Sequence, residues 1–491
     1  MNRVILYAAS IVAVLSSCSE SADIISNENT NEATQTPVNM SVYTAATTRA
    51  GKAGNITDAQ SLAENGGFGV FAYQTGSTNY TAGQAEFQPD FMYNQQVTGT
   101  DDATPEWSYS PIKYWPNDND DADNAGAKGL GKTGKVSFFA YAPYADLNAK
   151  DANKTSGIIA VSDNNVAGDP TVTYALTTDG SANVDLLWGT AGTNGTTVNG
   201  NSAQAGKKLA NSNKETVGLN LVNADLTKMK NGGKIQFVFK HALAKFGGND
   251  ANPTNPNGIL IKADPDITES TDNSTLGHST KITVKNITIT TDGAGKDAAS
   301  DDAKQDLVTS GSLNLATGVW TPSTTTTAAT LKTVISNTEN TGDAQLNADI
   351  AEPTSKPAAE TSETTKSFFD GKGVQKSPIN VYASEVNPFV FIPGTKIPSM
   401  KVTVEYVVRT KDSKVVNGYT TTTNKISKVI NFGGTEGTTV EMNKRYSLTI
   451  ILGLSGIKFD ATVAGWDEGT TTGGSGSGTS SAEVNLPVNV Q

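Results

Sequence analysis

A phosphate-binding loop is the most specific chemical pattern in the sequence. Residues 126–133 read GAKGLGKT, which fits the pattern G-x-x-x-x-G-K-[ST]. Such a loop binds phosphate when a buried strand precedes it and a helix follows, because backbone amides and the helix N-terminus supply the contacts. Here an acidic polar stretch, 117–123, precedes the loop, and a strand-like stretch, 134–138, follows it. We therefore expect a solvated hairpin loop and no nucleotide site.

Side chains suited to metal binding or acid–base catalysis are few. The acidic run 118–123 lacks the Gly and Glu positions of a calcium-binding EF-hand loop. The chain has two His, and His241 follows an apolar stretch, which favours a structural role. The single Cys leaves no intrachain disulfide and no Cys-rich metal site. We predict a protein that is not an enzyme and has no metal and no cofactor.

Clustered aromatic residues offer a different chemistry, since such rings can stack on sugars. The alternative is packing in the core and in a hairpin, which we favour. The residues are Trp107, Tyr109, Tyr114 and Trp115.

Composition limits the class of partner. The 491 residues carry a net charge of -12 and 18% charged residues. With a pI of about 4.8, the chain lacks the basic surface that nucleic acid requires. This length predicts two or three domains. The abundance of Thr, Asn, Gly and Ser favours an exposed β-rich protein.

The N-terminus has the pattern of an export signal. Arg3 precedes an apolar stretch, 4–15, which is too short for a membrane-spanning helix. Small residues then lead to Cys18, as in the lipobox of bacterial lipoproteins. This similarity implies a signal peptide over 1–17 and lipid attachment at Cys18, which would place the protein at a membrane surface. An ordinary signal peptide with an incidental Cys is the alternative.

Short segments with period-2 alternation predict half-buried antiparallel strands along most of the chain. We therefore predict an all-β fold of two β-sandwich domains, 50–212 and 213–468. A tract rich in Thr, Ala, Ser and Glu, 321–370, is interpreted as a surface insertion with a short helix near 331–335. The predicted strands are 68–73, 135–141, 184–188, 233–239, 281–289, 401–408 and 446–452.

The first predicted strand, 37–44, precedes a single arginine. Its apolar residues Val38, Met40 and Val42 alternate with polar ones. The four Arg of the chain are Arg3, Arg49, Arg409 and Arg445. An Arg-specific protease acting on the exported chain would therefore find one early site, directly after this strand.

The C-terminal tail has the clearest pattern of an amphipathic strand in the sequence. A Gly/Ser/Thr linker leads into it within 469–491, and its last ten residues alternate between apolar and polar side chains. A lone amphipathic strand is unstable in water, so the tail must pair with a sheet edge, either in its own domain or in another molecule. The apolar residues are Val484, Leu486, Val488 and Val490.

The two ends of the chain resemble each other. Residues 37–40 read PVNM and residues 487–490 read PVNV. If the first strand fills an apolar groove and is cut away after Arg49, the tail of another copy could fill that groove. Coincidence, with the tail folded on its own domain, is the alternative.

Several stretches together resemble the fimbrillin family, the type V pilin subunits of Bacteroidia-type fimbriae. Their order along the chain carries the resemblance more than any one of them. They are Leu15–Cys18, Thr48–Ala50, Trp107–Pro116, Val136–Pro143, Asp185–Trp188, Phe239–Lys245 and Lys444–Tyr446 leading to Trp466.

The resemblance implies two transthyretin-like sandwiches and a propeptide, 18–49, removed by an Arg-specific surface protease between Arg49 and Ala50. Polymerisation would follow by strand exchange, with 482–491 as donor strand. The implied partners are other copies, tip and anchor subunits, the protease and, before maturation, the outer membrane. Having both a cleavage site and a donor tail favours a shaft subunit. The alternatives are a tip or adaptor subunit, and a lipid-anchored glycan-binding lipoprotein.

Overall fold

The protein is all-β, as predicted, with two short helices among the described residues, α1 (Ala59–Glu64) and α2 (Tyr80–Gly83). These residues belong to one compact unit, Thr36–Gln491. The computed structural model describes residues 37–43, 56, 58–116, 134–147, 154–177, 183–191, 222–226, 234–247, 258–263, 280–291, 307–327, 330–331, 344–345, 379–382, 389–411, 414, 419–432, 437–453, 456–465, 484–486 and 488–490.

The strands fall into an earlier and a later set. The earlier strands are β1 (Asn39–Tyr43), β2 (Phe68–Gly76), β3 (Met92–Gly99), β4 (Trp107–Ser108), β5 (Lys135–Ala142), β6 (Gly157–Val161), β7 (Thr171–Ala175), β8 (Leu187–Ala191), β9 (Asn223–Leu226) and β10 (Lys234–His241). The later ones are β11 (Ala244–Phe246), β12 (Ile259–Ala263), β13 (Thr280–Thr290), β14 (Leu307–Val308), β15 (Ser310–Asn314), β16 (Trp320–Pro322), β17 (Thr326–Thr327), β18 (Thr330–Leu331), β19 (Ala344–Gln345), β20 (Ile379–Tyr382), β21 (Phe389–Phe391), β22 (Met400–Lys411), β23 (Tyr419–Phe432), β24 (Lys444–Leu452), β25 (Ile457–Gly465), β26 (Val484–Leu486) and β27 (Val488–Val490).

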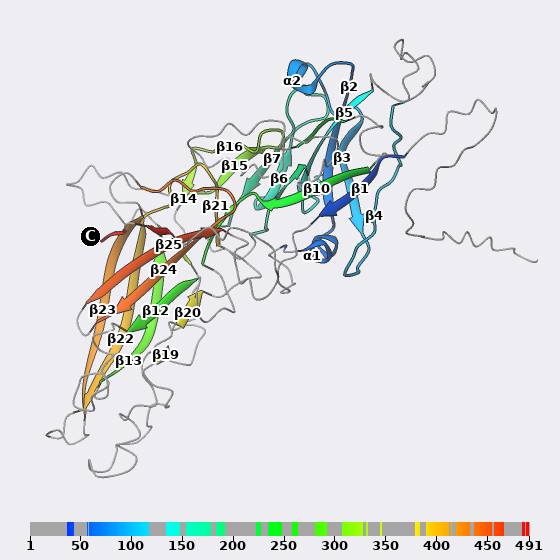
Figure 1. Cartoon of the computed structure of the whole chain (residues 1–491). Coiled ribbons are helices and arrows are strands. Elements are labelled where there is room, and N and C mark those ends of the chain that lie inside the picture. The colour runs from blue at the N-terminus through cyan, green and yellow to red at the C-terminus, as the bar shows by residue number, and fades with distance from the viewer. Residues whose placement is uncertain are drawn as a thin grey trace, which may run out of the picture. The chain divides into compact units, whose positions relative to one another are not determined.

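The first sheet carries the N-terminal strand at one end. Its order is β1-β10-β8-β5-β2-β3-β4, with β9 paired to β5. Figure 1 shows β1, in dark blue, alongside the green β10. A second, smaller sheet has the order β16-β15-β7-β6.

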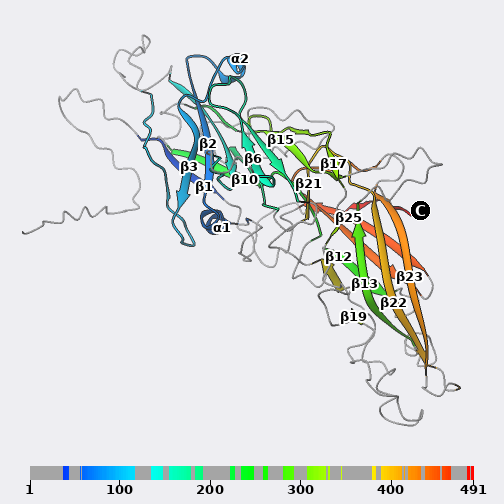
Figure 2. The ribbon, with the colours of Figure 1, turned by 180° about the vertical axis from the view of Figure 1, so that it is seen from behind.

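Two further sheets hold most of the C-terminal half. One has the order β20-β12-β24-β11-β21, with β25 on β24 and β26 on β25. The other has the order β18-β13-β22-β23-β27, and Figure 2 shows β13, β22 and β23 side by side. Along β22, Met400, Val402 and Val404 are buried while Lys401 is exposed, so this strand keeps the predicted period of two.

The first sheet extends beyond the domain boundary that the sequence predicts between 212 and 213. Both β9 and β10 follow residue 212 and still pair within the first sheet. Strand β15 returns from later in the chain to pair with β7. The division into two domains with a boundary at 212 stays a prediction, and the first sheet includes strands on both sides of that residue.

Local predictions in the C-terminal half need one correction. Leu331, the expected start of a helix, lies in strand β18, which pairs with β13. The tract 321–370 also contains the end of β16 and all of β17 and β19, so its described part is joined to the sheets. The β-branched Thr residues of this tract suit strands better than helices.

Several predicted features lie outside the described residues. They include the lipidation site Cys18, the cleavage site Arg49–Ala50, the phosphate-loop pattern 126–133, the acidic run 118–123 and the linker 469–481. Within the described part, no helix has the length and apolarity needed to cross a membrane.

Candidate functional site

Strand β1 lies in parallel register on β10. Asn39 is opposite Lys234, and the pairing continues to Tyr43 opposite Val238. Because side chains alternate along a strand, Val38 and Met40 turn to the same face. Their exposed fractions are 1% and 6%, whereas Asn39 is exposed. The predicted alternation of the first strand is therefore real, and its apolar face is buried.

The apolar face of β1 is part of one core cluster. Val38 and Met40 are buried there, and Val42 is half-buried against it. Ile235 and Phe237, which lie beside Met40 and Val42 in the register, are fully buried. Full burial of an aliphatic side chain contributes about 1.5–3 kcal/mol, so β1 is held by several kcal/mol of apolar contact before ordering costs.

The other side of β1 contacts the segment 109–114. The Val38 amide donates to the Lys113 carbonyl at 2.9 Å, and the Tyr109 hydroxyl donates to the Val38 carbonyl at 2.7 Å. Pro37 and Tyr114 form an antiparallel bridge. We call the surroundings of β1, formed by β10, segment 109–114 and the core cluster beneath, the β1 site. The main chain of β1 is thus held from both sides.

Tyr109 is suited to this contact because it stays neutral. Burial raises the pKa of its hydroxyl above the ordinary value, and a hydrogen bond from the Lys113 backbone lowers it in part. The hydroxyl therefore remains a donor throughout the physiological pH range. It also accepts from the Lys113 amide at 3.3 Å, which fixes its orientation.

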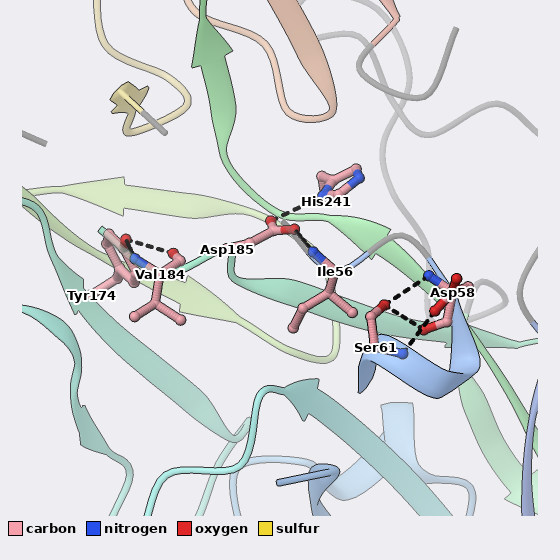
Figure 3. Close-up of polar contacts among 7 residues, drawn as sticks. All are labelled: Ile56, Asp58, Ser61, Tyr174, Val184, Asp185 and His241. Atoms are coloured by element: carbon pink, nitrogen blue, oxygen red, sulfur yellow. Dashed lines mark hydrogen bonds and ion pairs between the residues drawn. The ribbon is translucent and has the colours of Figure 1, made fainter. Parts of the chain in front are cut away.

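A buried carboxylate anchors the chain just downstream of β1. Asp185 and His241 are 2.9 Å apart between Oδ1 and Nδ1, and the Ile56 amide donates to Oδ2 of Asp185 at 2.9 Å (Figure 3). Asp185 is completely buried and His241 is 2% exposed. His241 is thus a buried structural residue, as predicted. Nothing in the spacing of Ile56, Asp185 and His241 predicts that they meet, and sequence reasoning missed this junction.

Helix α1 begins directly after this junction. Asp58 accepts from the Ser61 amide at 2.7 Å, and the Ser61 hydroxyl accepts from the Asp58 amide at 3.0 Å (Figure 3). This capping box satisfies amides that a helix start leaves unpaired. Ile56 and the start of α1 are therefore held by contacts that do not involve β1.

The C-terminal tail pairs with its own chain. Strand β26 is antiparallel to β25, and β27 is antiparallel to β23. The two strands thus lie in different sheets, with Pro487 between them. Of the two arrangements that the sequence left open, this single chain adopts the intramolecular one.

Comparisons with known proteins agree with this architecture. No family model matches the chain. The fimbrium subunit Fim1C of Phocaeicola vulgatus is 28% identical over 262 residues, which are 52% of this chain and 50% of that protein. The chain thus matches about half the length of this curated relative. A crystal structure of a fimbrial protein from Bacteroides vulgatus has the same fold, with a TM-score of 0.52 and 19% identity over 88% of this chain and 99% of that one. The resemblance to the fimbrillin family is confirmed.

In this fimbrillin-like chain, Val38, Met40 and Val42, which the sequence places in the first strand, come together in one site. The four apolar tail residues divide between β26 and β27, away from β1 in the strand order. Among the residues that the structure describes, the tail strands pair with β25 and β23 and not with β10.

The clustered aromatic residues pack instead of forming a sugar platform. Trp115 is 2% exposed and its ring lies 5.7 Å from that of Phe138. The Trp107 ring lies 5.2 Å from that of Phe68. Tyr109 holds β1, and Tyr114 alone of the four is largely exposed.

Proposed function

We propose that this protein is a structural, non-enzymatic subunit that polymerises into cell-surface fimbriae by protease-triggered strand exchange and so supports adhesion. The observation that carries the proposal is the seating of β1. This strand fills a site in the first sheet, yet it lies upstream of Arg49 and is joined to the rest of the domain only through the connector 44–55.

Cleavage between Arg49 and Ala50 would change how β1 is held. Before the cut, the connector keeps β1 next to its site. After the cut, only non-covalent contacts hold it, while Ile56 stays bonded to Asp185. The cut would also separate the mature chain from the lipid proposed on Cys18. One proteolytic event would therefore release the subunit from the outer membrane and make the β1 site available.

The tail of another copy is the proposed replacement for β1. Within its own chain the tail pairs with β25 and with β23, over three residues each. By comparison, β1 pairs with β10 over five residues and is also hydrogen-bonded by Tyr109 and Lys113. Among the described residues each tail strand pairs with one neighbour only, whereas the β1 site offers main-chain partners on both edges, which would favour the intermolecular arrangement once β1 has left. Exchange would then link subunits head to tail, which generates an open filament.

The relatives support a fimbrial role more than a glycan-binding one. One matched protein is a fimbrium subunit and the matched crystal structure is of a fimbrial protein. The packing of Trp107 and Trp115 removes the strongest sequence argument for a sugar-binding lipoprotein. The proposed partners are other copies, related tip and anchor subunits, and an Arg-specific surface protease.

Deleting 482–491, or introducing Leu486→Asp, tests the donor role. We expect protease-treated variants to remain monomeric while the wild-type chain forms polymers, because a charge cannot be buried in an apolar site without a large cost. Electron microscopy and denaturing gels of unheated samples measure the outcome. Asn485→Ser, on the polar face of the tail, is the control. Polymers of normal length from the deletion variant would rule out the tail as donor.

A further inference from the structure

We infer that the β1 site accepts the tail of a second copy in one register, set by a proline, with Val488 at the place of Val38 and Val490 at the place of Met40. Tyr109 holds the carbonyl of the residue that follows the proline. This inference rests on the proposed strand exchange and adds the register and the residue that recognises the incoming strand.

The hydrogen bonds of Val38 define which main-chain groups face which wall of the site. Its amide and its carbonyl both bind segment 109–114. Since successive residues of a strand turn their main-chain groups to opposite sides, those of Asn39 and Ser41 face β10. The ladder with β10 begins at the pair of Asn39 and Lys234. Pro37 precedes this ladder, so its missing amide costs no bond to β10.

The tail repeats this arrangement in its sequence. Pro487, Val488 and Asn489 match residues 37–39, and Val490 follows where Met40 stands. In this alignment the proline again precedes the ladder. The Val488 carbonyl would face the Tyr109 hydroxyl, and its amide would face the Lys113 carbonyl.

A register shifted by two residues is the strongest competitor. It would place Leu486, Val488 and Val490 at the three apolar positions of β1. However, Pro487 would then occupy the place of Asn39, within the ladder. Because proline has no amide hydrogen, a carbonyl of β10 would lose its hydrogen-bond donor. Such a loss weakens binding roughly 5- to 150-fold. The shifted register would gain apolar burial at the place of Val42. This place is only half-buried, so the gain offsets less of the lost hydrogen bond than a fully buried valine would.

Disulfide trapping distinguishes the two registers. The probe is a peptide of residues 482–491 with Asn489→Cys, added in excess to the full chain after cleavage at Arg49, which removes Cys18 with the propeptide. We expect a cross-link to the Lys234→Cys chain, because Asn489 would take the place of Asn39. A cross-link to Gln236→Cys instead would establish the shifted register, since Gln236 lies opposite Ser41, and would overturn the inference.

Tyr109→Phe tests the role of the hydroxyl. We expect peptide 482–491 to bind the cleaved variant about three- to tenfold more weakly, since one buried hydrogen bond is lost while the ring remains. Tyr93→Phe is the matched control, because Tyr93 is 40% exposed and its ring packs on Phe71. Equal affinities for the Tyr109→Phe and wild-type chains would contradict the assigned contact.

The outcomes separate this inference from the proposed function. If the peptide does not bind the cleaved chain in any variant, strand exchange into the β1 site itself is wrong. If it binds and polymers form, but Lys234→Cys gives no cross-link, only the register is wrong.

Discussion

At the scale of single residues, the strongest polar constraint is the buried carboxylate of Asp185. It is bonded to the His241 ring and to the Ile56 amide, and so joins the end of β10 to the chain between β1 and α1. Nearby, the Tyr174 hydroxyl donates to the Val184 carbonyl at 2.6 Å and accepts from the Val184 amide. Burial, with the charge of Asp185 adding to it, raises the pKa of Tyr174 far above its ordinary value. These bonds fix the loop before β8.

Replacing Asp185 should therefore lower the free energy of unfolding more than replacing the half-buried helix cap Asp58. We expect Asp185→Ala to lower the free energy of unfolding by about 3–5 kcal/mol, because His241 and the Ile56 amide lose a buried acceptor. Asp58→Ala, which removes the N-cap of α1, should cost about 1 kcal/mol. Denaturant unfolding of the uncut chain measures both. A loss for Asp185→Ala no greater than for Asp58→Ala would mean that the junction is not a principal anchor.

At the scale of elements, β1 and the tail are held differently. Strand β1 has a buried apolar face and main-chain partners on both sides. Strands β26 and β27 are short and lie in different sheets. The proposed exchange uses this difference, since each tail strand would leave a ladder on one side for a site with main-chain partners on both edges.

The burial of β1 can be tested by truncating its side chains. We expect Met40→Ala to lower the free energy of unfolding of the uncut chain by about 2–5 kcal/mol, because it opens a cavity among fully buried neighbours. Asn39→Ala on the exposed face should change it by less than about 0.5 kcal/mol. Thermal and denaturant unfolding compare the two. Similar small effects from both would show that β1 lies loosely on the surface.

At the scale of the whole molecule, the fold protects two of the four arginines. Arg409 lies in β22, between Lys281 of β13 and Thr421 of β23. Arg445 lies in β24 and is 3% exposed. Proteases bind their substrates as extended strands, so a residue already paired on both sides is not accessible to them. The sheets thereby limit which arginines can be cut.

The folded precursor should therefore resist an Arg-specific protease at both C-terminal arginines. We expect a product that begins at Ala50 and no fragment that ends at Arg409 or Arg445, because exposing either site requires opening a sheet. Intact mass and N-terminal sequencing identify the products. The urea-unfolded chain, cut at every arginine, is the control. Cleavage of the native chain at Arg409 would contradict the protection that β22 is expected to give.

The sequence by itself determined the class of fold and the local character of the key strands. Alternation of apolar and polar residues predicted β1, β22 and the tail, because a half-buried strand must place every second side chain on its buried face. The similarity between 37–40 and 487–490 was also visible there. These are properties of neighbouring residues, and so they are encoded within a few positions of the chain.

Only the tertiary structure decided which elements meet. It placed β1 in parallel beside β10, almost two hundred positions away in the sequence numbering, and brought Ile56, Asp185 and His241 together. It also paired the tail with two sheets of its own chain and placed β9 and β10 in the first sheet. Alternation specifies a buried face but not its partner, because many apolar strands offer an equally suitable neighbour. The choice among them comes from packing of the whole core, to which distant residues contribute together.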